Sequence, residues 1–171
     1  MKSGRISIFY KTNPLMILIL TGPTRNRKTT TLLKWSERRD DCGGVLSPEV
    51  DGLRVLYNVK TRQSIPWQKN IPDSESDLIV GRFSFEAEAF TVATGWLNEH
   101  LQDPHVRQII LDEVGMLELK GKGWGPWLNS ALPQLGEKIL ILVIRRSMMD
   151  DVINLYGMEE VSVVDKDYFR D

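Results

Sequence analysis

A run of small and basic residues at positions 22–30 has the spacing of a loop that binds phosphate groups. Its members are Gly22, Pro23, Thr24, Arg25, Asn26, Arg27, Lys28, Thr29 and Thr30. The run lies between an apolar, strand-like segment and a helical pattern, so successive backbone N–H groups would surround an anion at a helix N-terminus. Lys28 would add a positive charge beside the β- and γ-phosphates, and the hydroxyl of Thr29 would coordinate magnesium.

The loop departs from the usual pattern, G-x-x-x-x-G-K-[ST], because Arg27 replaces the second glycine. Glycine is used there because the backbone approaches the phosphate closely and adopts torsions that a Cβ atom disfavours. An arginine at this position either obstructs the loop or supplies another phosphate contact, and we favour obstruction. The alternative without a function is a basic, solvated start of a helix.

Two adjacent acids, Asp112 and Glu113, follow the apolar run Gln108–Leu111. An aspartate after a buried strand is suited to hold magnesium, and a neighbouring glutamate can deprotonate an attacking water. Adjacent side chains point to opposite faces of a flat strand, so we expect the pair to converge where the chain turns at Val114-Gly115. Surface acids also often end apolar strands, but a phosphate loop upstream favours a joint nucleotide site.

Other residues are candidates for contact with a bound nucleotide. Arg145 and Arg146 follow an apolar strand, where either one is a candidate to stabilise the charge of a phosphoryl-transfer transition state. Surface ion pairing explains both arginines equally well. Trp124 and Trp127 are a weaker candidate pair for covering the base, because tryptophans more often pack in a core.

Strand-like apolar runs alternate with helical patterns, which predicts an α/β fold: a largely parallel sheet covered by helices on both faces. We expect strands at Met16–Leu20, Gln108–Leu111, Lys138–Ile144 and Val161–Val164, and helices at Lys28–Arg39, Glu86–Leu101 and Met148–Tyr156. Asp51-Gly52 is a two-residue turn signal, so segment 45–59 is predicted to be an added β-hairpin. Segments 61–77 and 120–126 are predicted to be loops, the second of them mobile because of its glycines.

Length and composition indicate an ordinary globular protein. The chain has 171 residues, 42% hydrophobic and 26% charged, which predicts a single domain spanning residues 1–171. Its formal net charge is −1, so bulk attraction to nucleic acid or to a membrane surface is not expected. No run approaches the roughly 20 apolar residues of a membrane span, and the apolar run 15–20 is short for a signal peptide, so we predict a cytoplasmic protein. His100 and His105 are predicted to be surface or packing residues.

Four stretches resemble the small P-loop nucleoside-triphosphatases of the thermophilic-phosphatase and cancer-related NTPase type. The first is the phosphate loop, a degenerate Walker A motif at 22–30. The second, 43–54, resembles that family's glycine-led hairpin, with Gly52 and Arg54 in place. The third, 110–119, is similar to its extended Walker B signature and is the most specific of the four. The fourth, 141–146, resembles a late strand that ends in basic residues.

The resemblance implies a RecA-like, three-layer P-loop domain that hydrolyses ATP, GTP and other nucleoside triphosphates to diphosphates with magnesium. It implies that Lys28 and Thr29 bind phosphate and magnesium, and that Asp112 supports the metal. Glu113 would be the base, so Lys28 and Glu113 are the candidate catalytic residues. The departures in the phosphate loop also allow a weakened member that mainly binds nucleotide. A non-catalytic regulatory module and a small-molecule kinase remain as alternatives.

Overall fold

A mixed sheet forms the centre of the computed structural model, which describes residues 16–25, 27–70, 72 and 77–170. Within these residues the strand order is β11-β1-β10-β9-β2-β4-β3. The parallel strands are β11 (Val161–Val164), β1 (Met16–Leu20), β10 (Ile139–Ile144), β9 (Gln108–Val114) and β2 (Cys42–Leu46). The predicted parallel sheet is confirmed, and β10 separates β1 from β9.

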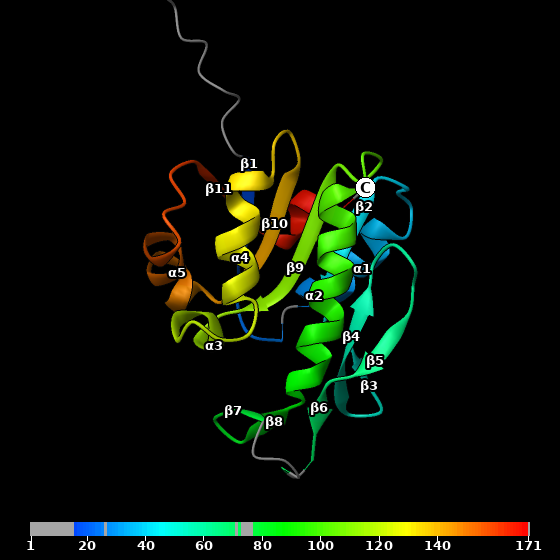
Figure 1. Ribbon diagram of the computed structural model, residues 1–171, viewed down its shortest axis with the longest axis vertical. Coiled ribbons are helices and arrows are strands. Elements are labelled where there is room, and N and C mark those ends of the chain that lie inside the picture. Colours follow the sequence, from blue (N-terminus) through cyan, green and yellow to red (C-terminus); the bar gives the residue numbers. More distant parts are fainter. Residues whose placement is uncertain (1–15, 26, 71, 73–76, 171) are drawn as a thin grey trace, which may run out of the picture.

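Antiparallel strands extend the sheet beyond β2. The strand β4 (Leu53–Asn58) pairs with β2, with β3 (Glu49–Val50) and with β5 (Ser64–Pro66), which confirms the hairpin predicted around Asp51-Gly52. A small second sheet contains β6 (Gln68–Lys69), β8 (Phe83–Phe85) and β7 (Leu78–Val80), at the lower end of Figure 1. The prediction of a loop over 61–77 was therefore wrong at β5 and β6. These strands are short, and the proline of β5 is tolerated because the strand lies at an edge.

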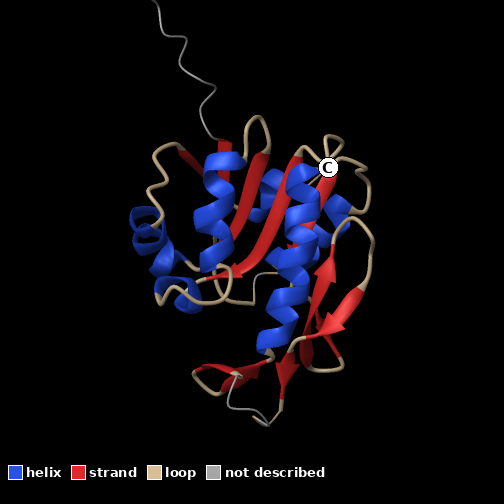
Figure 2. Cartoon of the chain, viewed as in Figure 1, coloured by secondary structure: helices blue, strands red, loops and turns tan. Residues whose placement is uncertain are grey.

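Helices cover both faces of the sheet, as Figures 1 and 2 show. On one face lie α2 (Ala87–Gln102), α4 (Gly125–Ala131) and α5 (Met149–Leu155), and on the other lie α1 (Lys28–Ser36) and the 3-10 helix η3 (Lys166–Phe169). The remaining helical segments are α3 (Met116–Leu119), η1 (Leu132–Gln134) and η2 (Arg146–Met148). Among the residues described, no helix is long and apolar enough to cross a membrane.

The central strands are continuous apolar runs because each contributes to two cores. In β1, Ile17 and Ile19 pack into the core under α2 and α4, whereas Leu18 and Leu20 pack with Leu32 of α1. The strand β10 alternates between the two cores in the same way. This alternation follows from the period of two in a strand. It produces the three-layer α/β architecture predicted from the sequence.

The segment 120–126, predicted to be a mobile loop, is anchored to the core. The carboxylate of Glu118, itself 1% exposed, accepts hydrogen bonds from the backbone N–H groups of Gly115 at 2.6 Å and Trp124 at 2.8 Å. Gly123 has a φ of 57°, and a Cβ there would collide with the Glu118 carboxylate. Trp124 is fully buried and packs edge-on against Phe90. The tryptophans are core residues, so neither covers a nucleotide base.

Candidate functional site

The phosphate loop and the acid pair meet at the edge where the parallel strands end. The loop follows β1 and leads into α1, while Asp112 lies near the end of β9. Thr29 Oγ1 donates a hydrogen bond to Asp112 Oδ2 at 2.7 Å, which joins residues that are 83 positions apart. Such edges are the usual ligand sites of open α/β sheets.

Two arginines give the phosphate loop its backbone shape. Arg25 and Arg27 have φ angles of 60° and 55°, in the left-handed region that glycine adopts more easily. Arg27 therefore adopts the backbone conformation that suits the glycine usually found at this position of the motif. The side chains of Pro23, Thr24, Arg25, Arg27 and Thr30 are exposed. Asn26 lies outside the described residues, so its predicted contact is not placed.

The lysine of the loop is bound to the loop itself. Lys28 Nζ donates to the carbonyl oxygens of Gly22 at 3.2 Å and Pro23 at 2.8 Å. Burial lowers the pKa of Lys28, and the positive charge of Arg145 lowers it further. Asp112 and Glu113 act in the opposite direction. Arg145 thus belongs to the electrostatic surroundings of the loop.

The other predicted transition-state arginine is less closely connected. Arg146 begins η2 and is exposed, and of the two arginines only Arg145 has a charge that acts on the pKa of Lys28 among the described residues. Arg145 itself is also exposed and precedes η2 in an extended conformation.

The acid pair converges through an irregularity inside β9. The strand does not end at Leu111 but continues through both acids to Val114. Its register with β10 shifts between Leu142 and Ile144, and Glu113 has a φ of 58°. A bulge of this kind redirects side chains that would otherwise alternate. The prediction that the pair converges at the Val114-Gly115 turn was wrong, because the change of direction occurs at Glu113.

Asp112 is the most fully bonded group of the site. Besides the Thr29 hydroxyl, its carboxylate accepts the backbone N–H of Ser47 at 3.1 Å and that of Glu113 at 2.9 Å. The residue is 1% exposed. Burial, followed by the charge of Glu113, raises the pKa of Asp112 to about 6. Its three hydrogen bonds oppose this rise.

The hairpin contributes residues to which the motifs assigned no role. Arg54 Nη1 lies 2.6 Å from Glu113 Oε1, in an ion pair whose side chains are 33% and 29% exposed. The same nitrogen donates to the carbonyl oxygen of Ser47 at 3.3 Å. The resemblance of segment 43–54 to a family hairpin was the one signal in the sequence that pointed to Arg54 and Ser47. It gave no indication of their contacts with the acids.

A comparison with protein families establishes what kind of chain this is. A sequence profile of the NTPase family matches residues 17–167. The chain belongs to the NTPase family. Membership confirms the resemblance to small P-loop nucleoside-triphosphatases and indicates a nucleoside-triphosphatase or nucleotide-binding role. A comparison with curated protein sequences gives no match.

Solved structures support the fold of this NTPase-family chain. The crystal structure of THEP1 from the hyperthermophile Aquifex aeolicus has a TM-score of 0.68 and 20% sequence identity, over 88% of this chain and 89% of that one. The solution structure of a human cancer-related nucleoside triphosphatase has a TM-score of 0.61 and 19% identity, over 89% of this chain and 88% of that one. At these sequence identities the similarity shows a shared fold, which is the predicted P-loop NTPase fold.

A buried histidine of α2 is hydrogen-bonded to β2, the strand that pairs with β9. Gly44 of β2 donates its N–H to His100 Nδ1 at 2.9 Å, and His100 is 3% exposed. Burial lowers the pKa of His100 to about 4. Gly44 has a φ of 112°, and a Cβ there would overlap the backbone of Ile110 in β9. His100 is a packing residue, as predicted, and its hydrogen bond connects α2 to β2.

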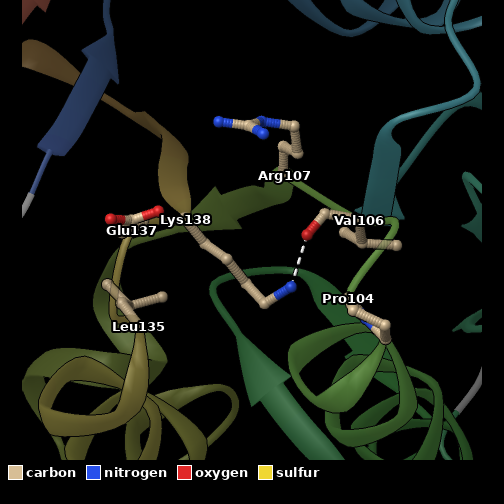
Figure 3. Close-up of a pocket in the computed structure, with 6 residues that line it drawn as sticks. All are labelled: Pro104, Val106, Arg107, Leu135, Glu137 and Lys138. Atoms are coloured by element: carbon tan, nitrogen blue, oxygen red, sulfur yellow. Dashed lines mark hydrogen bonds between the residues drawn. The ribbon is translucent and has the colours of Figure 1, made fainter.

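A cavity of about 260 Å³ lies at the opposite edge of the sheet (Figure 3). It is lined by Pro104, Val106, Arg107, Leu135, Glu137 and Lys138, which precede β9 and β10. The ammonium group of Lys138 turns to the carbonyl oxygens of Val106 and Asp103. The ammonium group is therefore occupied by hydrogen bonds to nearby backbone carbonyls. The cavity itself lies far from the phosphate loop.

Proposed function

We propose that this chain hydrolyses nucleoside triphosphates, ATP and GTP among them, to the diphosphate and inorganic phosphate with magnesium. The observation that carries the proposal is the 2.7 Å hydrogen bond from Thr29 Oγ1 to Asp112 Oδ2. A merely basic helix start has no need of a buried carboxylate beside its first turn. The contact supports a single site in which the loop binds phosphate and the acids act on it.

The groups proposed to hold the phosphates are the backbone N–H groups at the start of α1 and the ammonium of Lys28. The helix dipole favours an anion at this end. Lys28 Nζ now donates to Gly22 O and Pro23 O. We expect phosphate oxygens to replace these carbonyls, because hydrogen bonds between two charged groups are stronger than bonds to a neutral carbonyl.

Thr29 and Asp112 fit a magnesium ion. Magnesium prefers oxygen ligands and is usually held by one or two carboxylates together with substrate phosphates and waters. The pair offers a hydroxyl and a carboxylate, and Ser47 Oγ nearby is a buried hydroxyl that lacks a hydrogen-bond partner in the described part of the chain. When bound, the ion would neutralise charge on the β- and γ-phosphates.

Glu113 is the proposed general base. Its side chain is 29% exposed, so water can reach it, and it lies next to the residue proposed to support the metal. The carboxylate would take a proton from water as the water oxygen bonds to the γ-phosphorus. The bond from the γ-phosphorus to the bridging oxygen would break, and the diphosphate would leave with its electron pair. Arg145 is the better placed of the two predicted arginines to act on the developing charge, because it already acts on Lys28.

Phosphate release from ATP and from GTP, measured with magnesium and with excess EDTA, tests the proposal. We expect magnesium-dependent release from both nucleotides without an acceptor. Binding of a non-hydrolysable triphosphate without any release would make the chain a non-catalytic module. Diphosphate formation that requires an added acceptor would make it a kinase.

The assignment of the metal to Asp112 has its own test. Asp112→Asn should raise the magnesium concentration needed for half-maximal binding of the non-hydrolysable triphosphate. Asp150→Asn, at an exposed position in the first turn of α5, is the matched control and should not change it. An unchanged magnesium requirement in Asp112→Asn would remove Asp112 from the metal site.

A further inference from the structure

Among the described residues, Arg54 is the one cation whose side chain forms an ion pair with the proposed base, Glu113. Its Nη1 atom lies 2.6 Å from Glu113 Oε1 and also donates to Ser47 O at 3.3 Å. The backbone N–H of Arg54 donates to Gln68 Oε1 at 3.4 Å, which connects the main chain at Arg54 to β6. The guanidinium is thus held at the end of a short strand, directly beside the acid pair.

The contacts of Arg54 close a ring around the two acids. Ser47 donates its N–H to Asp112 and accepts from Arg54 through its carbonyl oxygen. Arg54 pairs with Glu113, whose own N–H donates to the other oxygen of Asp112. Both acids are therefore connected to the hairpin, so the loss or movement of the Arg54 side chain removes the ion-pair partner of Glu113.

The guanidinium is not fully used by this ring. Arginine carries five N–H donors, and the described hydrogen bonds and ion pairs of its side chain involve Nη1. One third of the side chain is exposed, on the side of the molecule where Glu113 is open to water. An anion that enters beside Glu113 therefore finds a cation with free donors.

We propose that Arg54 recognises the γ-phosphate: when a triphosphate binds, the guanidinium leaves the Glu113 carboxylate for a γ-phosphate oxygen. The exchange replaces one charge-assisted hydrogen bond by another, and the planar guanidinium of arginine can bind two oxygens of a phosphate group at once. It frees Glu113 to accept a proton from water, so the base is released when the group to be attacked is present. A diphosphate does not trigger the exchange because it lacks that group. The inference rests on the proposed function for the position of the γ-phosphate.

Binding of two nucleotides to Arg54 variants tests the inference without relying on turnover. Isothermal titration with magnesium compares ADP with the β,γ-imido analogue of ATP. Arg54→Ala should weaken the analogue by about 10- to 100-fold and leave ADP within about twofold. Arg54→Lys should recover part of the loss, because it keeps the charge without the planar donor pair. Arg62→Ala, at an exposed position just past the other end of β4, should change neither affinity.

A double-mutant cycle with Glu113→Gln tests the exchange itself. In the presence of Arg54, Glu113→Gln should tighten the analogue by a few-fold more than it does in the Arg54→Ala background, because the ion pair no longer has to break. Relief of repulsion between Glu113 and the phosphate is common to both backgrounds and cancels. An equal gain in analogue affinity from Glu113→Gln in both backgrounds would overturn the inference. So would an Arg54→Ala variant that binds ADP and the analogue equally more weakly. A protein that binds the analogue through Arg54 but releases no phosphate would keep the inference and refute the proposed hydrolysis.

Discussion

The phosphate loop and the acid-bearing end of β9 share one hydrogen bond but are held in place by different means. In the loop, exposed side chains follow one another, and Arg25 and Arg27 occupy left-handed backbone conformations. The ammonium of Lys28 is bonded to two carbonyl oxygens of the loop itself. These contacts are local to the loop, so a ligand can replace them at small cost.

The acid end is held by elements that are distant in sequence. Asp112 accepts hydrogen bonds from α1, from the segment after β2 and from its own strand, and Arg54 of β4 holds Glu113. The left-handed Glu113 costs on the order of 1–3 kcal/mol, which persists only where the surroundings fix it. We infer that the loop adapts to the phosphates, whereas Asp112 and the backbone of Glu113 are already fixed and only the Arg54–Glu113 ion pair is exchanged on binding. The two regions should therefore respond differently to mutation.

The largest effect is expected at Glu113. Glu113→Gln keeps the shape and the ability to hydrogen bond but removes the base, so turnover should fall about 10²–10⁴-fold with no loss of triphosphate binding. Phosphate release and titration of the same preparation measure both. Glu88→Gln, exposed in the first turn of α2, is the control. A variant as fast as the wild type would place the base elsewhere, and buried Glu118, which is bonded to two backbone N–H groups, is a poor substitute.

The pH dependence of stability should reveal the buried, neutral state of His100. The pKa of His100 is about 4 in the fold, against about 6.5 in an unfolded chain, so the unfolded chain binds more protons between these values. This contribution to the free energy of unfolding falls as the pH drops from about 6.5 to about 4. Asp112 opposes it, because its raised pKa lets the folded chain bind the extra proton below about pH 6. The contribution of His100 must therefore be obtained by comparing the wild type with a variant that lacks the histidine.

His100→Asn keeps an acceptor for the Gly44 N–H and removes the titration. Between pH 7 and pH 5, the wild type should lose about 2 kcal/mol more of its unfolding free energy than this variant. Urea denaturation in metal-free buffer at both pH values gives the difference. His105→Asn, at an exposed position, should behave as the wild type. Equal pH dependence of wild type and His100→Asn would show that His100 is not the buried neutral group described.

The loop should respond in affinity rather than in stability. Lys28→Ala removes the charge proposed to lie at the β- and γ-phosphates, so triphosphate binding should weaken by about 10- to 100-fold while the fold is kept. Lys34→Ala, exposed further along α1, is the control and should bind normally. Equal affinities of Lys28→Ala and the wild type in titration would remove the phosphate-loop assignment.

The smallest effect is expected at Arg27. Glycine relieves the left-handed strain, so Arg27→Gly should raise the free energy of unfolding by about 1 kcal/mol. If the arginine obstructs the loop, as we predict, the same change also tightens the non-hydrolysable triphosphate. Arg38→Gly, at a position outside the left-handed region, should not stabilise the protein. Weaker binding by Arg27→Gly would mean that the guanidinium is a phosphate ligand and that the prediction of obstruction is wrong.

The sequence predicted best what local patterns determine. Continuous apolar runs predicted β1 and β10, and the spacing from Gly22 to Thr29 predicted the strand, loop and helix that the fold contains. The bulge at Glu113 was not predictable from the run that precedes it, since it depends on the register between β9 and β10. Arg54 was also missed as part of the site, because its role comes from a contact between residues 59 positions apart. The anchoring of segment 120–126 was missed because its glycines suggested mobility and the buried Glu118 carboxylate was not recognisable as their support.

Hydrolysis in water enriched in ¹⁸O tests most directly the central claim that the acid end activates water against the γ-phosphorus. With ATP and magnesium, attack at that atom should place one ¹⁸O in each inorganic phosphate at its formation and none in the ADP. Mass spectrometry of both products reads the position of the label. Label in the diphosphate, or transfer of the phosphoryl group to another acceptor without label, would contradict the account, and so would the absence of any phosphate release by a protein that binds ATP.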